Sequence, residues 1–261
     1  MMNICGCFTP SNQEENTTAD VVESVESRAQ TQYALGYEQQ DSGNLDEAIR
    51  FYKECIKINK RHIDAHYNLG NVLQEKGELN AASEYFKKAI VLNPSHHLAH
   101  YNLGYIYYEK TNLPVALKYF EKASKLNDQD VDTWINLGLV YRDMENLEAS
   151  ARANLKAVAI DPRCEMAYYN LGNTYHDFNR VDEAIEYYSK AVELNPNHAD
   201  AFFNLGVVYQ EKREIEKALD LYEKASTIDP TLQEAAEAVV ALKTYLVEKA
   251  KASGKSKKGK R

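Results

Sequence analysis

Apolar residues recur along most of this chain at helical spacing, in runs that come in pairs. Around residue 103, for instance, Leu103, Ile106 and Tyr107 fall on one helical face, and a second amphipathic run follows from Val115 to Leu126. A short polar turn separates the two runs, and its turn-forming residues in successive copies are Gly43, Gly77, Asn112, Asn146 and Asn179. Each copy therefore predicts a helix, a turn and a second helix.

The paired runs repeat every 34 residues without an insertion. The marker of each copy is a Leu-Gly pair in the first run, at Leu35-Gly36, Leu69-Gly70, Leu103-Gly104, Leu137-Gly138, Leu171-Gly172 and Leu205-Gly206. Six units follow one another at residues 29–62, 63–96, 97–130, 131–164, 165–198 and 199–232. A fixed internal period of this length predicts a stack of units, each burying its apolar face against its neighbours.

Three further positions in each unit carry residues of nearly constant size. The side chain is small twelve and nineteen residues after the glycine, and sixteen residues after it stand Tyr52, Phe86, Phe120, Asn154, Tyr188 and Tyr222. Small residues let two helices approach closely, and a large ring fills the space beside them. Unit four has Ser150 and Asn154, so we expect either a void or a buried polar group, and a locally softer structure, at this place.

The 34-residue unit resembles the tetratricopeptide repeat, a helix-turn-helix unit, over 204 of the 261 residues. This resemblance implies an all-α fold, a right-handed α-solenoid of six units. Residues 233–250 have one apolar face and predict a helix that caps the stack. Residues 1–28 and 251–261 are too polar to bury a core, so we expect a flexible N-terminal segment and a disordered basic tail.

Composition changes this picture little, but charge restricts the partners. Hydrophobic residues make up 44% of the chain, enough for a buried core, and no apolar run approaches the length of a membrane span. The net charge is −8, yet the last thirteen residues carry seven positive charges, so residues 1–248 carry −15. An acidic body disfavours nucleic-acid binding, so only the basic tail could bind nucleic acid or an anionic membrane, and its simpler interpretation is a solubilising end. Four irregularly spaced cysteines indicate a reducing compartment, and we expect a cytoplasmic protein, with the nucleus as the alternative.

Five asparagines recur on the predicted first helices, two residues before the glycine, about 100° around the helix from the buried leucine. We call them the asparagine ladder: Asn68, Asn102, Asn136, Asn170 and Asn204. Asn71 and Asn173, one residue after the glycine in units two and five, complete the set of amides predicted to bind peptide. An amide offers two donors and an acceptor, which suits the backbone of an extended peptide. The ladder therefore predicts a concave groove that binds an extended segment with loose sequence preference.

An acidic series lies on the same helical stripe, seven residues after each ladder position. We call it the acidic rail: Glu75, Glu109, Asp143, Asp177 and Glu211, with Asp41 in unit one. Charge complementarity then favours a neutral or basic peptide. The alternative interpretations are structural: the asparagines bond between adjacent units or to water, and the carboxylates form a solvated face.

Within the repeat family, the ladder resembles that of the superhelix in O-linked N-acetylglucosamine transferases, which implies asparagines that hold substrate peptides. Only 29 residues follow the sixth unit, so we expect no glycosyltransferase domain. The carboxylate clamp of co-chaperones needs lysines and an arginine on the first helices, and this sequence does not supply them.

Histidines and cysteines invite a metal interpretation that their spacing does not support. His62 and His66 are four residues apart, but His66 and His100 occupy a repeat position that holds an aromatic residue in later units, so packing explains them. Cys5 and Cys7 could be acylated or bind a metal, yet two cysteines in a polar terminus are more often free thiols. We expect no metal site and no cofactor.

No catalytic motif is recognisable: the chain has neither a phosphate-binding loop nor a Gly-x-Ser-x-Gly turn, and we interpret it as a non-enzyme. The leading hypothesis is a scaffold or adaptor that binds an extended segment of a partner protein, with no small-molecule substrate. The alternative is a substrate-recruiting or regulatory subunit of a separate enzyme, such as a protein glycosyltransferase.

Overall fold

The computed structural model describes residues 24–258, with side chains through Lys251, and it contains two helices in each of the six units. The first helices are α1 (Val25–Asp41), α3 (Ile63–Glu75), α5 (His97–Glu109), α7 (Val131–Asp143), α9 (Glu165–Asp177) and α11 (Ala199–Glu211). The second helices are α2 (Leu45–Ile58), α4 (Leu79–Leu92), α6 (Leu113–Leu126), α8 (Leu147–Ile160), α10 (Val181–Leu194) and α12 (Ile215–Ile228). No strand occurs among the described residues, and the predicted all-α fold is confirmed.

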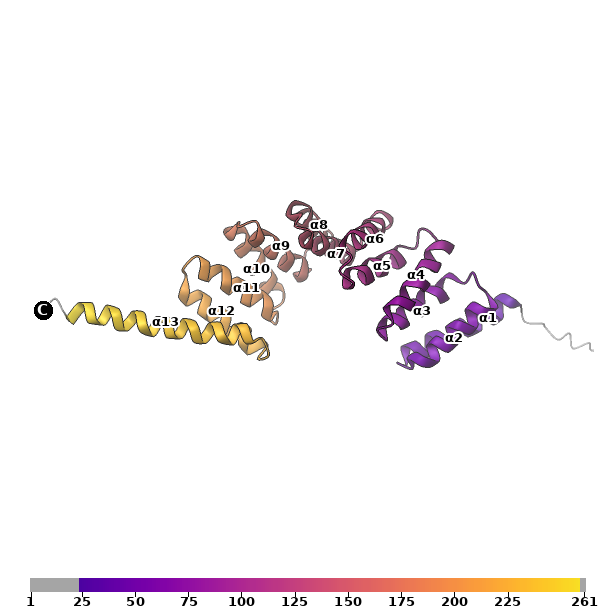
Figure 1. Ribbon diagram of the computed structural model, residues 1–261, viewed down its shortest axis with the longest axis horizontal. Helices are drawn as coiled ribbons and strands as arrows, with labels where there is room; N and C mark the ends of the chain where they lie inside the picture. Colours follow the sequence, from indigo (N-terminus) through magenta and orange to yellow (C-terminus); the bar gives the residue numbers. More distant parts are fainter. Residues whose placement is uncertain (1–23, 259–261) are drawn as a thin grey trace, which may run out of the picture.

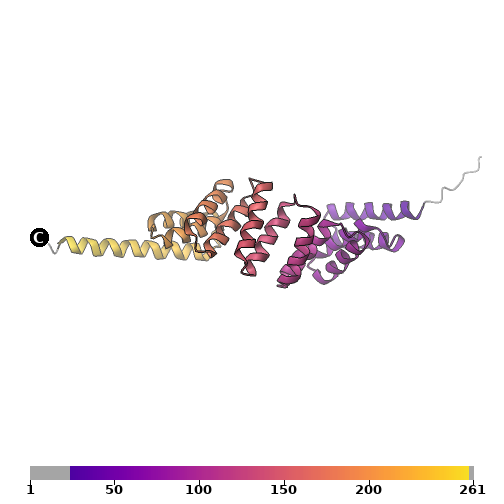
Figure 2. The same ribbon diagram turned by 90° about the horizontal axis from the view of Figure 1, so that it is seen from above.

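The units stack in chain order into an arch, the predicted right-handed α-solenoid (Figure 1). Seen from above, the helix pairs follow one another in a single row (Figure 2). Successive first helices contact one another, as α5 with α7 and α7 with α9 do, whereas successive second helices make no comparable contact within the described part of the chain. Because the inside of a bent stack is its more crowded side, the first helices line the concave face and the second helices line the convex face.

Both ends of the solenoid extend beyond the helices expected from the sequence. Helix α1 begins at Val25, four residues before the predicted first unit, and the Ser24 side chain caps it by accepting from the Ser27 amide at 3.0 Å. Helix α13 (Gln233–Lys258) packs against α12 and continues eight residues past residue 250. Cys5, Cys7 and most of the predicted flexible segment 1–28 lie outside the described residues, as do residues 259–261 of the tail. Within residues 24–258, no helix is both long enough and apolar enough to span a membrane.

An aromatic ring packed on a glycine forms the centre of five units. Phe86 is fully buried, and a Cβ added to Gly70 would lie only 2.6 Å from its ring, so no other residue fits there without movement. In unit four, Asn154 occupies the place of the ring against Gly138 and is also fully buried. Its Nδ2 donates to the Ser150 carbonyl at 3.0 Å, while its Oδ1 has no partner among the described residues. Of the two expected alternatives, the structure therefore shows a buried polar group that is only partly satisfied.

The turn between the two helices needs a residue with positive φ seven residues after the glycine of the Leu-Gly pair. Glycine meets this requirement in the first two units, at Gly43 (φ 75°) and Gly77 (φ 76°). Later units place Thr111, Glu145, Asn179 and Arg213 there. Asn112 and Asn146, expected in the turn, take the next position and precede the first residues of α6 and α8.

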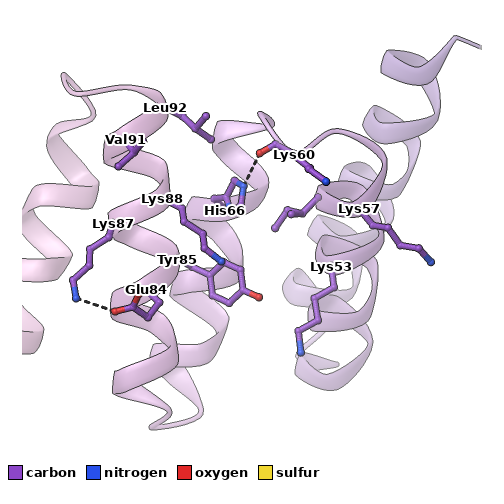
Figure 3. A pocket seen from close by; sticks show the side chains of 11 residues that line it. Lys53, Lys57, Lys60, His66, Glu84, Tyr85, Lys87, Lys88, Val91 and Leu92 are labelled. Atoms are coloured by element: carbon purple, nitrogen blue, oxygen red, sulfur yellow. Dashed lines mark hydrogen bonds and ion pairs between the residues drawn. The ribbon is translucent and has the colours of Figure 1, made fainter.

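The histidines have structural partners. Before the first helices of three units, a ring Nδ1 accepts from the backbone amide three residues later, at His62, His96 and His198. His66 and His100 direct Nε2 at the carbonyl of the residue six before, at 3.0 and 3.1 Å, and a carbonyl can only accept, so Nε2 carries the proton (Figure 3). Burial lowers the pKa of both rings. Within the described residues, no three His, Cys, Asp or Glu side chains gather as a metal site.

Candidate peptide-binding surface

The asparagine ladder runs along the concave face, and four of its five amides bond to the preceding unit. A tyrosine hydroxyl of that unit accepts the Nδ2 hydrogen bond, at 3.0 to 3.2 Å, from Asn68, Asn136 and Asn204. An asparagine carbonyl of that unit accepts from Asn102 (2.7 Å, Asn71) and again from Asn204 (3.0 Å, Asn173). The structural interpretation of the ladder therefore accounts for much of its donor capacity.

The acceptor capacity of these four amides is not used. Within residues 24–251, no donor reaches the Oδ1 atoms of Asn68, Asn102, Asn136 and Asn204. Asn136 and Asn204 each donate two hydrogen bonds, whereas Asn68 and Asn102 each donate one and keep an N–H. The ladder can therefore accept from the N–H groups of a bound backbone, and at two positions it can also donate.

Asn170 is the exception in the ladder. It is 97% buried, and its Nδ2 has no partner among the described residues. In other pairs of units, the acceptor comes from one of two repeat positions of the preceding unit. In unit four these positions hold Ile135 and Leu139, which have no polar side-chain atom. This loss of a partner was not predicted, although the 34-residue register contains the information.

The tyrosines that accept from the ladder are packed between neighbouring rings. Tyr169, for example, lies 4.7 Å from the His198 ring and 6.0 Å from the Tyr188 ring, centroid to centroid. Burial raises the pKa of Tyr101 to about 12, so its hydroxyl stays protonated at neutral pH. These rings belong to the contact between units, and their hydroxyls fix the orientation of the ladder amides.

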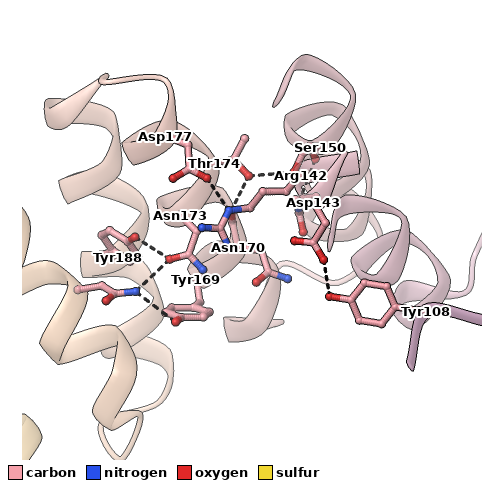
Figure 4. A network of polar contacts seen from close by, with 12 residues as sticks. Tyr108, Arg142, Asp143, Ser150, Tyr169, Asn170, Asn173, Thr174, Asp177 and Tyr188 are labelled. Atoms are coloured by element: carbon pink, nitrogen blue, oxygen red, sulfur yellow. Dashed lines mark hydrogen bonds and ion pairs between the residues drawn. The ribbon is translucent and has the colours of Figure 1, made fainter. Parts of the chain in front are cut away.

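The acidic rail is exposed, and three of its carboxylates meet a side chain of the preceding unit, two of them, Asp143 and Asp177, in the region drawn in Figure 4. The pairs are Tyr108 with Asp143 (2.8 Å), Arg142 with Asp177 (2.6 Å) and His176 with Glu211 (3.0 Å). The three partners share one repeat position, four residues after the glycine, and sequence reasoning missed them. Glu75 and Glu109 form no ion pair within the described part of the chain, so their charge is available to a ligand.

The structure separates the two additional asparagines of the predicted site. Asn173 is buried, and its Oδ1 accepts from the Tyr188 hydroxyl at 2.7 Å and from Asn204 at 3.0 Å (Figure 4). Burial raises the pKa of Tyr188, so this hydroxyl remains a donor. Asn71 is only half-buried and borders a surface hollow. Both asparagines accept from the ladder amide of the next unit, but only Asn71 is also accessible from the groove.

A concave hollow of about 510 Å³ between α3 and α5 brings four predicted residues together: Asn71, Asn102, Glu75 and Glu109. Tyr105 and Gln74 also border it, and the Gln74 Oε1 is a buried acceptor without a partner among the described residues. Two carboxylates without an ion-pair partner, beside unused amide oxygens, form a surface that attracts N–H donors and positive charge. The other predicted residues lie along the same row of first helices without sharing this hollow.

Comparison with known proteins gives one repeat family along the chain. Tetratricopeptide repeat models match residues 63–96, 97–130, 131–164 and 199–232, and a TPR repeat model matches residues 36–77 and 172–213. No curated protein matches the chain in sequence.

Three solved structures illustrate the similarity. YrrB, a TPR protein with an unusual peptide-binding site, is 30% identical over 72% of this chain and 96% of its own, with a TM-score of 0.60. MamA (41-end) from Desulfovibrio magneticus RS-1 is 26% identical over 67% of this chain and 99% of its own, with a TM-score of 0.62. PilF of Pseudomonas aeruginosa shares the fold at 19% identity, over 82% of this chain and 97% of its own, with a TM-score of 0.70.

Proposed function

This chain belongs to the tetratricopeptide repeat family, and we propose that it is an interaction scaffold that binds an extended segment of a partner protein along its concave face. Proteins built from these repeats are generally non-catalytic scaffolds. The peptide-binding site named for YrrB, which is similar to this chain over most of its length, supports a peptide ligand.

The observation that carries the proposal is the hollow between α3 and α5. Its carboxylates, Glu75 and Glu109, form no ion pair within the described residues and lie beside Asn102, whose Oδ1 has no donor there. An extended peptide presents backbone N–H groups at regular intervals, and these donate to the ladder oxygens while a lysine or arginine side chain lies between the two carboxylates. Recognition of the backbone explains a loose sequence preference, and the carboxylates favour a neutral or basic segment.

The proposal is tested with a peptide selected on the full chain from a random dodecapeptide library. We expect the triple variant Asn68→Ala, Asn102→Ala, Asn136→Ala to bind it about 100-fold more weakly, from about 1 kcal/mol for each lost hydrogen bond. The matched control replaces Asn80, Asn112 and Asn197, three exposed asparagines outside the ladder, and should bind like wild type. Equal affinity of the two triple variants would contradict the proposal.

A single-site pair separates binding from a purely structural role. Asn102→Asp keeps an acceptor oxygen and removes the donor to Asn71, whereas Asn102→Ala removes both. We expect Asn102→Asp to retain affinity for a basic peptide and Asn102→Ala to lose it, with circular dichroism melts reporting stability for both. Parallel losses of affinity and stability in the two variants would assign Asn102 to the unit contact alone.

Recruitment of substrates for a separate enzyme would use the same groove. Co-purification of a catalytic chain with wild type, but not with the triple ladder variant, would identify this form of the function.

A further inference from the structure

A second hollow lies on the opposite, convex face, between α2 and α4, with a volume of about 580 Å³ (Figure 3). Five lysines line it: Lys53, Lys57, Lys60, Lys87 and Lys88. Glu84 is its single acidic lining residue. In a chain with a net charge of −8, this concentration of positive charge is local, and it continues into the next hollow along the convex face, which Lys118, Lys122 and Lys125 line.

Much of this positive charge is free. Lys53, Lys60 and Lys88 form no ion pair within the described residues, while Lys57 and Lys87 pair with glutamates of their own helices at 3.3 and 2.9 Å. The Lys88 ammonium lies 4.6 Å from the centre of the Tyr85 ring, where it remains exposed. A bound carboxylate would therefore not have to displace an acidic partner from these three lysines.

The lining between the lysines is apolar. Ile56, Tyr85 and Leu92 border the hollow, and Val91 beside them is 80% exposed, an unfavourable arrangement for a large aliphatic side chain in water. The site therefore combines an apolar surface that gains from being covered with a surrounding group of unpaired cations.

The corresponding hollow three units later shows that the fold does not impose this chemistry. It has a volume of about 400 Å³ and is lined by Tyr168, Glu186, Tyr187, Ser189, Lys190 and Glu193. Ser189 stands in the place of Lys87, and Glu193 in the place of exposed Val91. The same architecture is thus basic and apolar between α2 and α4, and largely acidic and polar on α10.

We propose that the convex hollow between α2 and α4 binds an acidic segment of a partner protein that carries a bulky apolar side chain among its carboxylates. The carboxylates pair with Lys53, Lys60 and Lys88, and the apolar side chain covers Val91, Leu92 and the Tyr85 ring. Since this ligand has the charge opposite to the one the concave rail favours, one chain can hold two chemically different partners on its two faces.

The probe that tests this site is a fluorescein-labelled peptide with one leucine flanked by three glutamates on each side, measured by anisotropy on the full chain. We expect Lys53→Glu, Lys60→Glu, Lys88→Glu to weaken binding about tenfold or more. The matched control, Lys156→Glu, Lys190→Glu, Lys224→Glu, makes the same change in net charge elsewhere on the convex helices and should leave affinity within about twofold. Circular dichroism confirms that both variants remain folded.

Four results would overturn the proposal. One is no measurable binding of the probe to the wild-type chain, and another is an equal loss of affinity in the two triple variants. A third is equal binding of a probe with serine in place of leucine, or of a short oligothymidylate, which would show attraction of any polyanion. A fourth is binding of the probe only after residues 1–22 are removed, which would assign the hollow to the acidic N-terminal residues of the chain itself.

Discussion

Two contacts between neighbouring units, one between units two and three and one between units four and five, place different residues at the same repeat positions. In unit three, the Phe120 ring packs on Gly104, and Asn102 donates to Asn71 of unit two. In unit four, Asn154 replaces the ring, and Asn170 of unit five has no acceptor in the unit before it. The comparison shows that the solenoid keeps its geometry when a ring and an inter-unit hydrogen bond are both lost. Polar side chains, not all of them hydrogen-bonded, then take the place of apolar packing.

Hydrogen bonds replace part of the lost packing in units four and five. The Ser150 and Thr174 hydroxyls lie 2.9 Å apart, and Thr174 donates to the Asn170 carbonyl at 2.8 Å (Figure 4). The Asn154 Oδ1 and the Asn170 Nδ2 nevertheless remain without partners in the described residues. Unsatisfied buried atoms cost about 1–3 kcal/mol each, but units two and three also contain them, at His66, Gln74 and His100. The lower stability expected between units four and five therefore rests on the lost ring and the lost inter-unit bond.

The largest expected difference between the two regions concerns the ring itself. Phe120→Ala should destabilise the chain by about 3–5 kcal/mol, because it removes a fully buried ring and leaves a cavity. Asn154→Ala should cost about 1 kcal/mol, since it removes one hydrogen bond but also an unsatisfied carbonyl oxygen. Urea unfolding followed by circular dichroism, fitted unit by unit, measures both values. Equal losses of unfolding free energy would show that Phe120 and Asn154 contribute equally to the stability of their units.

The glycines should show the next largest difference. A Cβ on Gly104 would lie 2.8 Å from the Phe120 ring, so Gly104→Ala should cost about 1–3 kcal/mol through displacement of the ring. At Gly138 the neighbour is the amide end of Asn154, which rotates more easily than a packed ring. We therefore expect Gly138→Ala to cost less than Gly104→Ala in the same unfolding assay, and the reverse order would contradict this account of the contact.

A third change should restore the missing bond. Ile135→Tyr places a hydroxyl where units one, three and five offer one to the ladder, and it should stabilise the contact between units four and five by about 1 kcal/mol. Ile135→Phe is the matched control, because it adds the ring without the hydroxyl. Hydrogen exchange of α7 and α9 amides distinguishes them, and equal protection in both variants would remove the Asn170 bond from the explanation.

The smallest expected effect is a pH dependence confined to the N-terminal half. Burial lowers the pKa of His66 and His100 below 6.5, so the unfolded chain binds more protons than the folded chain as pH falls through that value. Stability should therefore decrease below about pH 6.5. The decrease should be smaller in the double variant His66→Tyr, His100→Tyr, because tyrosine, the residue found at this repeat position in unit five (Tyr168), does not titrate in this range. Unfolding at about pH 7.5 and pH 5.5 provides the measurement, and an unchanged slope would contradict the assignment to these rings.

The sequence predicts the architecture well because the 34-residue register repeats every packing position six times. It also places Asn102 and Glu109 on one helical stripe, and the structure brings them together in a single hollow. The bonding of the ladder was not predictable, because the contact between Asn68 and Tyr33 depends on the distance between two units.

Two other features were not predicted from the sequence, for different reasons. The hollow between α2 and α4 joins residues of three helices, and its shape depends on how the stack bends. The missing partner of Asn170 was readable in principle, since Ile135 stands where Tyr101 stands one unit earlier.

The most direct test of the concave groove is an NMR titration of the chain, labelled with ¹⁵N in its asparagine side chains, with the selected dodecapeptide. We predict that the Nδ2 signals of Asn68, Asn102 and Asn136 shift on binding while those of Asn80, Asn112 and Asn197 stay in place. Binding of the peptide without any shift of the ladder signals would contradict the claim that these amides hold the partner's backbone.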